Sequence, residues 1–189
     1  MRNLFFIFVF ILGVVLYPGF LWAGGLDPKY HSKEEFSLKI PFGRNYNYTN
    51  ILVKRVVDGD TLILESGERV RLIGIDTPEM HDSDKLIRDS RRSKVSASEI
   101  KAMGRKSYEF TKKIAEGKRV NLEFDVERYD KYKRLLAYVY LEDGTFVNAQ
   151  IVKEGYASLM TYPPNVKYAD LFLGLYQEAR ENRRGLWKD

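Results

Sequence analysis

The chain has 189 residues, of which 44% are hydrophobic and 30% are charged, and its 31 Lys and Arg residues outnumber its 26 Asp and Glu residues, giving a net charge of +5. It contains no cysteine and two histidines, which excludes a disulfide scaffold, a cysteine-ligated zinc site, an iron–sulfur cluster, a thiol nucleophile and a multi-histidine metal centre. Any chemistry must therefore use carboxylates, Arg, Lys, Tyr and hydroxyl groups, and the basic excess favours a polyanionic partner.

The amino-terminal residues have the pattern of an export signal. Arg2 precedes an apolar run over residues 4–16, and a Pro-Gly pair ends this run before it reaches the roughly 20 residues of a spanning helix. Small residues at 23–25 offer a cleavage site. We expect residues 1–25 to be a signal peptide and the protein to be exported, either secreted or periplasmic. The alternative is an uncleaved amino-terminal anchor, which would place the protein at a membrane.

The remaining chain divides into a linker and one domain. Residues 26–49 show no sustained period and are expected to form a linker, whereas residues 50–189 are expected to fold as the domain. The domain opens with apolar runs separated by Asp-Gly and Ser-Gly turn dipeptides, a pattern typical of a three-stranded meander. These runs cover residues 51–57, 61–65 and 70–75.

The rest of the domain alternates between helical and strand patterns. A polar stretch over residues 80–95 has no apolar period and is expected to be a loop. Helices are predicted over residues 96–116, 147–154 and 168–183, and strands over residues 119–125 and 135–141. Five strands in the order three, helix, two predict an α+β fold, mainly β: a five-stranded OB-fold barrel with about three helices packed on it.

Polar clusters lie at the strand ends and in the adjacent loops. The sequences at residues 58–61 (Asp-Gly-Asp-Thr), 71–79 (Arg-Leu-Ile-Gly-Ile-Asp-Thr-Pro-Glu) and 130–138 (Asp-Lys-Tyr-Lys-Arg-Leu-Leu-Ala-Tyr) resemble the thermonuclease, or staphylococcal nuclease-like, family. The resemblance covers about residues 50–189. It implies an OB-fold, calcium-dependent phosphodiesterase that cuts DNA and RNA.

The resemblance also implies a role for particular residues. Asp60 and Asp76 are implied as side-chain calcium ligands, and Thr77 as a ligand through its backbone carbonyl. Arg71 and Arg134 are implied to bind the phosphate, and Glu79 to act on the attacking water. Substrate contacts are implied for Tyr132 and Tyr162, and Lys131 is expected to contact a phosphate.

The chemistry of these residue types agrees with those roles, but each has a plainer interpretation. Carboxylates and a carbonyl are the hard oxygen donors that Ca²⁺ takes, and guanidiniums form paired hydrogen bonds with phosphate oxygens. A glutamate near a cation can hold or deprotonate water. Alternatively, the aspartates belong to turns, the arginines form surface ion pairs, the glutamate is solvated, and the tyrosines pack structurally.

Two positions depart from the family pattern. Lys133 stands where the family usually has glycine, so a turn that needs a positive φ would be strained there and could displace Arg134. The stretch over residues 80–95 is longer than the family leads us to expect, and it carries several arginines. It either overhangs the site and steers nucleic acid into it, or it is a solvated loop without effect on the rate.

Two functions are therefore compared. The first is an exported, calcium-dependent nuclease that acts on DNA and RNA with little sequence preference, most simply as a monomer. The second is a nucleic-acid-binding OB module that has lost catalysis. A decayed domain is expected to lose at least one of the five charged residues of the site, and all five are present: Asp60, Arg71, Asp76, Glu79 and Arg134.

Overall fold

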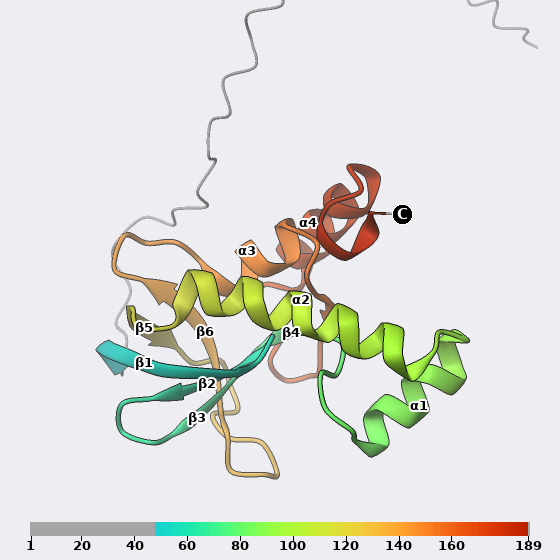
Figure 1. The fold of residues 1–189 in the computed structure, drawn as a ribbon. Coiled ribbons are helices and arrows are strands. Elements are labelled where there is room, and N and C mark those ends of the chain that lie inside the picture. The colour runs from blue at the N-terminus through green and yellow to red at the C-terminus, as the bar shows by residue number, and fades with distance from the viewer. Residues whose placement is uncertain (1–47, 189) are drawn as a thin grey trace, which may run out of the picture. The chain divides into compact units, whose positions relative to one another are not determined.

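The computed structural model describes residues 48–188 of the chain (Figure 1). The expected signal segment, residues 1–25, and residues 26–47 of the expected linker lie outside the described residues. The first strand, β1 (Tyr48–Asp58), begins two residues before the expected start of the domain. Within the described part of the chain, no helix has both the length and the hydropathy needed to cross a bilayer.

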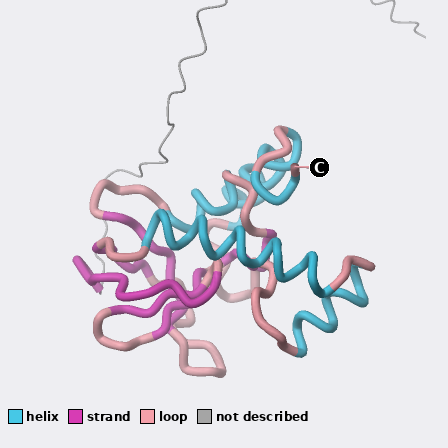
Figure 2. The backbone as a smooth tube through the Cα atoms, viewed as in Figure 1, coloured by secondary structure: helices cyan, strands magenta, loops and turns pink. Residues whose placement is uncertain are grey.

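Five strands close into a barrel, which confirms the predicted fold class. The barrel order is β1-β2-β3-β6-β5, with β2 at Thr61–Leu64, β3 at Arg69–Leu72, β5 at Arg119–Glu123 and β6 at Leu135–Leu141. Neighbouring strands pair in antiparallel fashion except β3 and β6, which are parallel. Figure 2 shows these strands gathered into one body beside the helices.

The barrel interior follows from the period-two pattern of the strands. Leu62, Leu64, Val70 and Leu72 are at most 1% exposed, while Arg71 lies between the last two and projects from the opposite face. Each fully buried aliphatic side chain contributes about 1.5–3 kcal/mol to stability. The apolar set of β2 and β3 therefore holds the barrel closed and points Arg71 outward, toward the site.

The third apolar run, residues 70–75, is not a single strand as predicted. It divides at Ile73 into β3 and a short strand β4 (Gly74–Asp76), which pairs with β7 (Ser158–Met160) in a separate two-stranded sheet. Gly74 has φ +83°, a conformation that glycine adopts without steric cost, and this residue redirects the chain. At three residues, β7 is too short to leave a readable period in the sequence.

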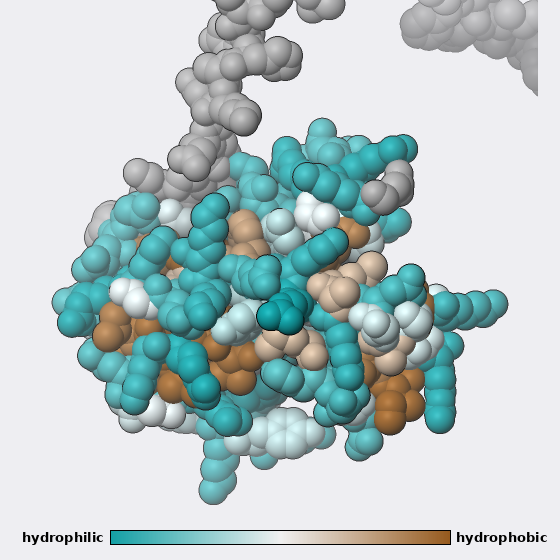
Figure 3. Space-filling view, viewed as in Figure 1, coloured by the Kyte–Doolittle hydropathy of each residue, from teal (hydrophilic) through white to brown (hydrophobic). Residues whose placement is uncertain are grey.

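Three helices match the predicted ones. They are α2 (Ala97–Ala115), α3 (Val147–Lys153) and α4 (Ala169–Glu181), and a 3-10 turn, η1 (Gly185–Trp187), follows α4. Ser96 and Glu99 form a capping box at the start of α2. Figure 1 shows α2 crossing beside the barrel, with α3 and α4 beyond it, and Figure 3 shows that the face viewed here is mostly hydrophilic, with smaller hydrophobic areas between.

A fourth helix replaces the predicted loop over residues 80–95. Helix α1 (Asp84–Ser93) begins after Ser83, whose Oγ accepts a hydrogen bond from the Leu86 backbone N–H. Leu86 is the one buried residue of this helix, so the apolar period that would have predicted a helix is absent. The expectation of a loop was wrong because a cap and one buried leucine fix this short helix, and one buried residue leaves no repeated apolar period in the sequence.

Candidate active site

The predicted site residues meet at one cleft of about 820 Å³ at the edge of the barrel. Its walls come from the turn between β1 and β2, from β3 and β4, from α1, and from the loops around residues 127–134 and 160–165. With the exception of Thr77, every residue named from the family resemblance lines it: Asp60, Arg71, Asp76, Glu79, Lys131, Tyr132, Arg134 and Tyr162. A cleft of this size accommodates a segment of a polymer.

Asp60 is held in a fixed orientation at the base of the cleft. It is 4% exposed, and its Oδ2 accepts hydrogen bonds from the Thr77 backbone N–H at 2.9 Å and from the Thr77 hydroxyl at 3.0 Å. The Thr61 hydroxyl lies 3.0 Å from Oδ1. Thr77 itself is buried beneath the cleft. These bonds give the carboxylate one orientation, as a ligand or charge partner requires.

Arg71 joins the two aspartates. Its Nη2 lies 2.8 Å from Asp76 Oδ1, and its Nη1 forms an ion pair with Asp60 Oδ2. Burial lowers the pKa of Arg71, and the neighbouring Asp76 carboxylate opposes that shift. A guanidinium keeps its proton in proteins, so Arg71 is a permanent positive charge between two carboxylates.

Lys85 is a site residue that the sequence did not reveal. Its Nζ lies 2.9 Å from Asp76 Oδ1, 3.0 Å from Glu79 Oε1 and 3.1 Å from the Thr77 carbonyl oxygen. Burial alone would lower the pKa of Lys85, but the two carboxylates more than offset it, so the pKa is raised. Lys85 lies in the stretch expected to be a loop, and no sequence signal separates it from the other basic residues there.

Both carboxylate oxygens of Glu79 are in contact with residues at the start of α1. The Ser83 hydroxyl donates to Glu79 Oε2 at 3.3 Å, while Lys85 contacts Oε1. Gly104 of α2 packs against the backbone here, since a Cβ at that position would lie 2.6 Å from the Pro78 carbonyl oxygen. The loop that carries Glu79 is therefore fixed by both α1 and α2.

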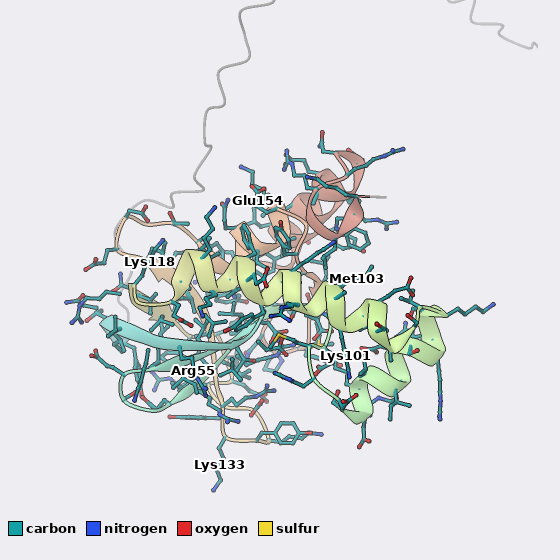
Figure 4. All side chains as sticks on the ribbon, in the orientation of Figure 1. Arg55, Lys101, Met103, Lys118, Lys133 and Glu154 are labelled. Atoms are coloured by element: carbon teal, nitrogen blue, oxygen red, sulfur yellow. The ribbon has the colours of Figure 1, made fainter. Side chains whose placement is uncertain are left out.

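Arg134 lines the cleft and lies just before β6, the strand that pairs with β3, which carries Arg71. Its Nε lies 2.7 Å from Asp130 Oδ2, and Asp130 Oδ1 accepts hydrogen bonds from the backbone N–H groups of Tyr132 and Arg134. The turn does need a positive φ, as Lys133 adopts φ +61°. Figure 4 shows the Lys133 side chain pointing away from the protein at the tip of this loop, and Arg134 still faces the cleft.

Two exposed tyrosines flank the cleft. Tyr132 is 69% exposed and Tyr162 is 70% exposed, and both line the cleft wall. Lys131 Nζ lies 5.1 Å from the centre of the Tyr132 ring. The loop that carries Tyr162 is held by Asn165, whose side chain donates to the Glu127 carbonyl and accepts from its backbone N–H, each at 2.8 Å. The two exposed rings are suited to stacking with bases.

The donor set fits a hard cation that keeps open positions. Within residues 48–188, no three His, Cys, Asp or Glu side chains gather closely enough to hold a metal by themselves. The Lys85 ammonium nevertheless shows that carboxylate and carbonyl oxygens converge on one positive centre. A calcium ion accepts such oxygens and completes its shell with water or substrate oxygens. The residues thus suit a weakly held ion rather than a closed structural site.

Comparison with known proteins identifies the family. Residues 69–189 match the family model described as Staphylococcal nuclease homologue. The chain belongs to the staphylococcal nuclease family. It is 41% identical over 140 residues to Thermonuclease of Staphylococcus intermedius, covering 72% of this chain and 75% of that protein. It is 31% identical over 148 residues to Thermonuclease of Staphylococcus hyicus, covering 77% and 79%, respectively.

A third relative comes from another genus. The chain is 32% identical over 163 residues to Endonuclease YncB of Bacillus subtilis, covering 83% of this chain and 71% of that protein. The family match begins at Arg69 of β3, so it includes Arg71, Asp76, Glu79 and Arg134. Membership of the staphylococcal nuclease family agrees with the barrel and with the residues that meet at the cleft.

Proposed function

We propose that this chain is a calcium-dependent endonuclease that hydrolyses phosphodiester bonds in DNA and RNA with little sequence preference. The observation that carries the proposal is the meeting of Asp60, Asp76, Glu79, Arg71 and Arg134 at one open cleft in a member of the staphylococcal nuclease family. The relatives named thermonuclease and endonuclease support this activity.

The acidic side of the cleft would hold the cation. Asp60, Asp76 and the Thr77 carbonyl supply its protein ligands, and the Asp60 carboxylate is already oriented by the Thr77 N–H and hydroxyl. Calcium bound there supplies positive charge that draws in the phosphate and offsets the negative charge of the transition state. The cleft of about 820 Å³ leaves room for substrate oxygens beside the cation.

The two arginines act on the phosphate from neighbouring strands, since Arg71 is on β3 and Arg134 lies just before β6, which pairs with β3. Hydrolysis adds negative charge to the phosphorus centre as the water oxygen bonds to it and the bond to the leaving nucleotide oxygen breaks. Arg71 and Arg134 donate hydrogen bonds to the phosphate oxygens and stabilise that charge, each contributing about 3–4 kcal/mol to lowering the barrier. The carboxylates of Asp76 and Asp130 orient the guanidiniums before substrate binds.

Glu79 handles the attacking water. It lies on the acidic side of the cleft, and its loop is fixed by α1 and α2. Its carboxylate accepts a proton from the water as the oxygen attacks phosphorus, and the leaving oxygen takes up a proton from solvent. A carboxylate in this place explains why the site needs a glutamate in addition to the two aspartates.

Substrate breadth follows from the contacts on the remaining walls. Tyr132 and Tyr162 would stack with bases, and every base offers a flat face, so stacking does not select sequence. Lys131 would contact a neighbouring phosphate. Export is part of the proposal and is supported by the pattern of residues 1–25; we propose a monomer that meets a membrane only if this segment stays attached.

The direct experiment is a cleavage assay on purified protein with DNA or RNA, in Ca²⁺ and in EGTA. We expect both polymers to be cut in Ca²⁺ and neither to be cut in EGTA. Cleavage that persists in EGTA would remove the calcium role. Gel retardation of nucleic acid without cleavage in either buffer would instead identify a binding module that has lost catalysis.

A further inference from the structure

The Lys85 ammonium occupies the acidic side of the cleft, where the proposed function puts a metal ion. Its three oxygen contacts, at 2.9–3.1 Å, are to Asp76, Glu79 and the Thr77 carbonyl. Two of these groups, Asp76 and Thr77, are proposed ligands of the cation. The same oxygen atoms therefore bind either the Lys85 ammonium or a metal ion, and the two cations compete for them.

We propose that Lys85 is a tethered competitor of the metal ion, which fills the oxygen group in the metal-free protein and must withdraw when calcium binds. This inference rests on the proposed function, because it names the cation that Lys85 opposes. It adds to the control of the same site a residue that lies outside the three sequence motifs named above. The consequence is that the protein binds calcium more weakly than its oxygen ligands alone would allow.

The start of α1 holds the backbone of Lys85 next to the oxygen atoms that its ammonium contacts. Ser83 caps α1 and also donates to Glu79, and Leu86, the next residue after Lys85, is 2% exposed and anchors the helix. The backbone of Lys85 is therefore fixed between a cap and a buried side chain. At the same time, the Lys85 side chain is 25% exposed, and its flexible stem can swing its ammonium into water.

Electrostatics require the withdrawal. Arg71 contacts both aspartates, and Lys85 also contacts Asp76. A calcium ion bound by Asp76 would therefore be a third positive charge beside these two. Like charges this close repel strongly in a partly buried site. A divalent ion competes for the same carboxylate oxygens, and the ammonium that leaves regains its hydration. Calcium binding is thus an exchange of one cation for another rather than the filling of an open site.

The loss of calcium affinity depends on the fraction of molecules in which Lys85 does not contact the ligand oxygens. Apparent affinity falls in proportion to that fraction, so an ammonium that occupies the site in about 90% of molecules weakens calcium binding about tenfold. Lys85→Met keeps most of the aliphatic stem and removes the charge. We expect Lys85→Met to bind calcium about tenfold more tightly than the wild type.

The test is isothermal titration of calcium into the metal-free full chain, without substrate. The matched control is Lys106→Met, which removes one lysine charge from an exposed position of α2 outside the cleft and is expected to change affinity less than twofold. Unchanged or weaker binding by Lys85→Met would overturn the proposal. So would an equal gain in both variants, because it would show a general charge effect.

A second measurement uses the wild type and does not depend on a variant that folds. Lysine acetylation with an amine-reactive ester, read by mass spectrometry, reports how accessible each ammonium is. We expect calcium to raise the acetylation rate of Lys85 several-fold and to leave Lys106 unchanged. A rate at Lys85 that calcium does not raise would contradict the exchange.

The two proposals fail in different ways. Calcium-dependent cleavage together with equal calcium affinity of wild type and Lys85→Met would overturn the role of Lys85 and leave the nuclease proposal intact. A wild type that cleaves DNA in EGTA and binds no calcium would overturn both the cofactor and the competition. Cleavage and titration of the same preparation therefore separate them.

Discussion

Arg71 Nη2 lies 2.8 Å from Asp76 Oδ1, although the two residues belong to different sheets. Arg71 is on β3 of the barrel, and Asp76 is on β4, which pairs with β7. The redirection of the chain at Gly74 brings them together. The ion pair therefore links the barrel to the small sheet, and the geometry of the cleft depends on this turn.

Gly74→Ala tests the turn. Gly74 has φ +83°, and a Cβ there would lie 2.4 Å from the Phe172 ring. We expect a loss of about 3–4 kcal/mol in the free energy of unfolding, from backbone strain plus overpacking. Gly67→Ala is the matched control, because Gly67 has φ +88° with no atom near its Cβ, and it should cost about 1–2 kcal/mol. Equal losses in urea denaturation would contradict the packing argument.

Glu79→Gln tests the handling of water. The amide keeps the shape of the side chain but does not accept a proton at neutral pH, so kcat should fall by about 10²–10⁴-fold while the far-UV spectrum is unchanged. Glu142→Gln, an exposed position beyond β6 that does not line the cleft, should keep wild-type turnover. Turnover near wild type in Glu79→Gln would remove this residue from the mechanism.

Arg134→Gln tests the stabilisation of charge on the phosphate. We expect kcat/KM to fall by about 10²–10³-fold, with most of the loss in kcat, because the extra charge exists only in the transition state. Arg128→Gln removes a guanidinium that packs over the Phe124 ring rather than facing the cleft, and it should leave kcat unchanged. A loss confined to KM would show that Arg134 binds the ground state only.

The basic face of α1 is proposed to steer nucleic acid toward the cleft, which Arg88 lines. We measure the slope of log(kcat/KM) against the logarithm of the salt concentration. In the double variant Arg88→Gln and Arg92→Gln, this slope should be less steep by about one to two, because two positive charges that attract phosphates are removed. Lys118→Gln with Lys153→Gln removes the same charge outside the cleft and should keep the wild-type slope. Identical slopes in the two double variants would reject steering.

The ionisation of Asp130 makes the free energy of unfolding depend on pH in the acid range. Burial alone would raise the pKa of Asp130, but hydrogen bonds from the backbone and guanidinium of Arg134 more than offset it, so the pKa is lowered. The ionised carboxylate therefore stabilises the fold above about pH 4, and this stability is lost as pH falls through the lower folded-state pKa.

Asp130→Asn should thus cost about 2 kcal/mol at about pH 7, and the difference from wild type should shrink below about pH 4. Urea denaturation midpoints measured across this pH range report the difference directly. A difference that stays constant down to about pH 3 would show that the Asp130 charge does not contribute to stability.

The sequence predicted the barrel because its strands carry strong local patterns. In β6, the predicted residues 135–141 are the observed strand, and the helix predicted over residues 96–116 is α2, observed over residues 97–115. The split at Ile73 and Gly74 was missed because both halves of that run are apolar, so periodicity carries no mark of the change of sheet.

The site was predictable to the extent that its residues lie in recognisable motifs. Asp60, Asp76 and Arg134 were named because their motifs resemble the thermonuclease family, and the structure brings them to one cleft. Lys85 could not be named, because its position depends on α1, and α1 depends on a cap and one buried leucine rather than on a period. Lys133 shows the opposite case: its strained turn was foreseen, and the structure accommodates it with φ +61°.

The most direct measurement is a crystal structure of the protein with Ca²⁺ and a non-hydrolysable dinucleotide, with anomalous scattering used to locate the ion. We expect calcium bound by Asp60, Asp76 and the Thr77 carbonyl, with the phosphate between Arg71 and Arg134 and the Lys85 ammonium withdrawn. Calcium bound elsewhere, or a phosphate that contacts neither arginine, would contradict this expectation.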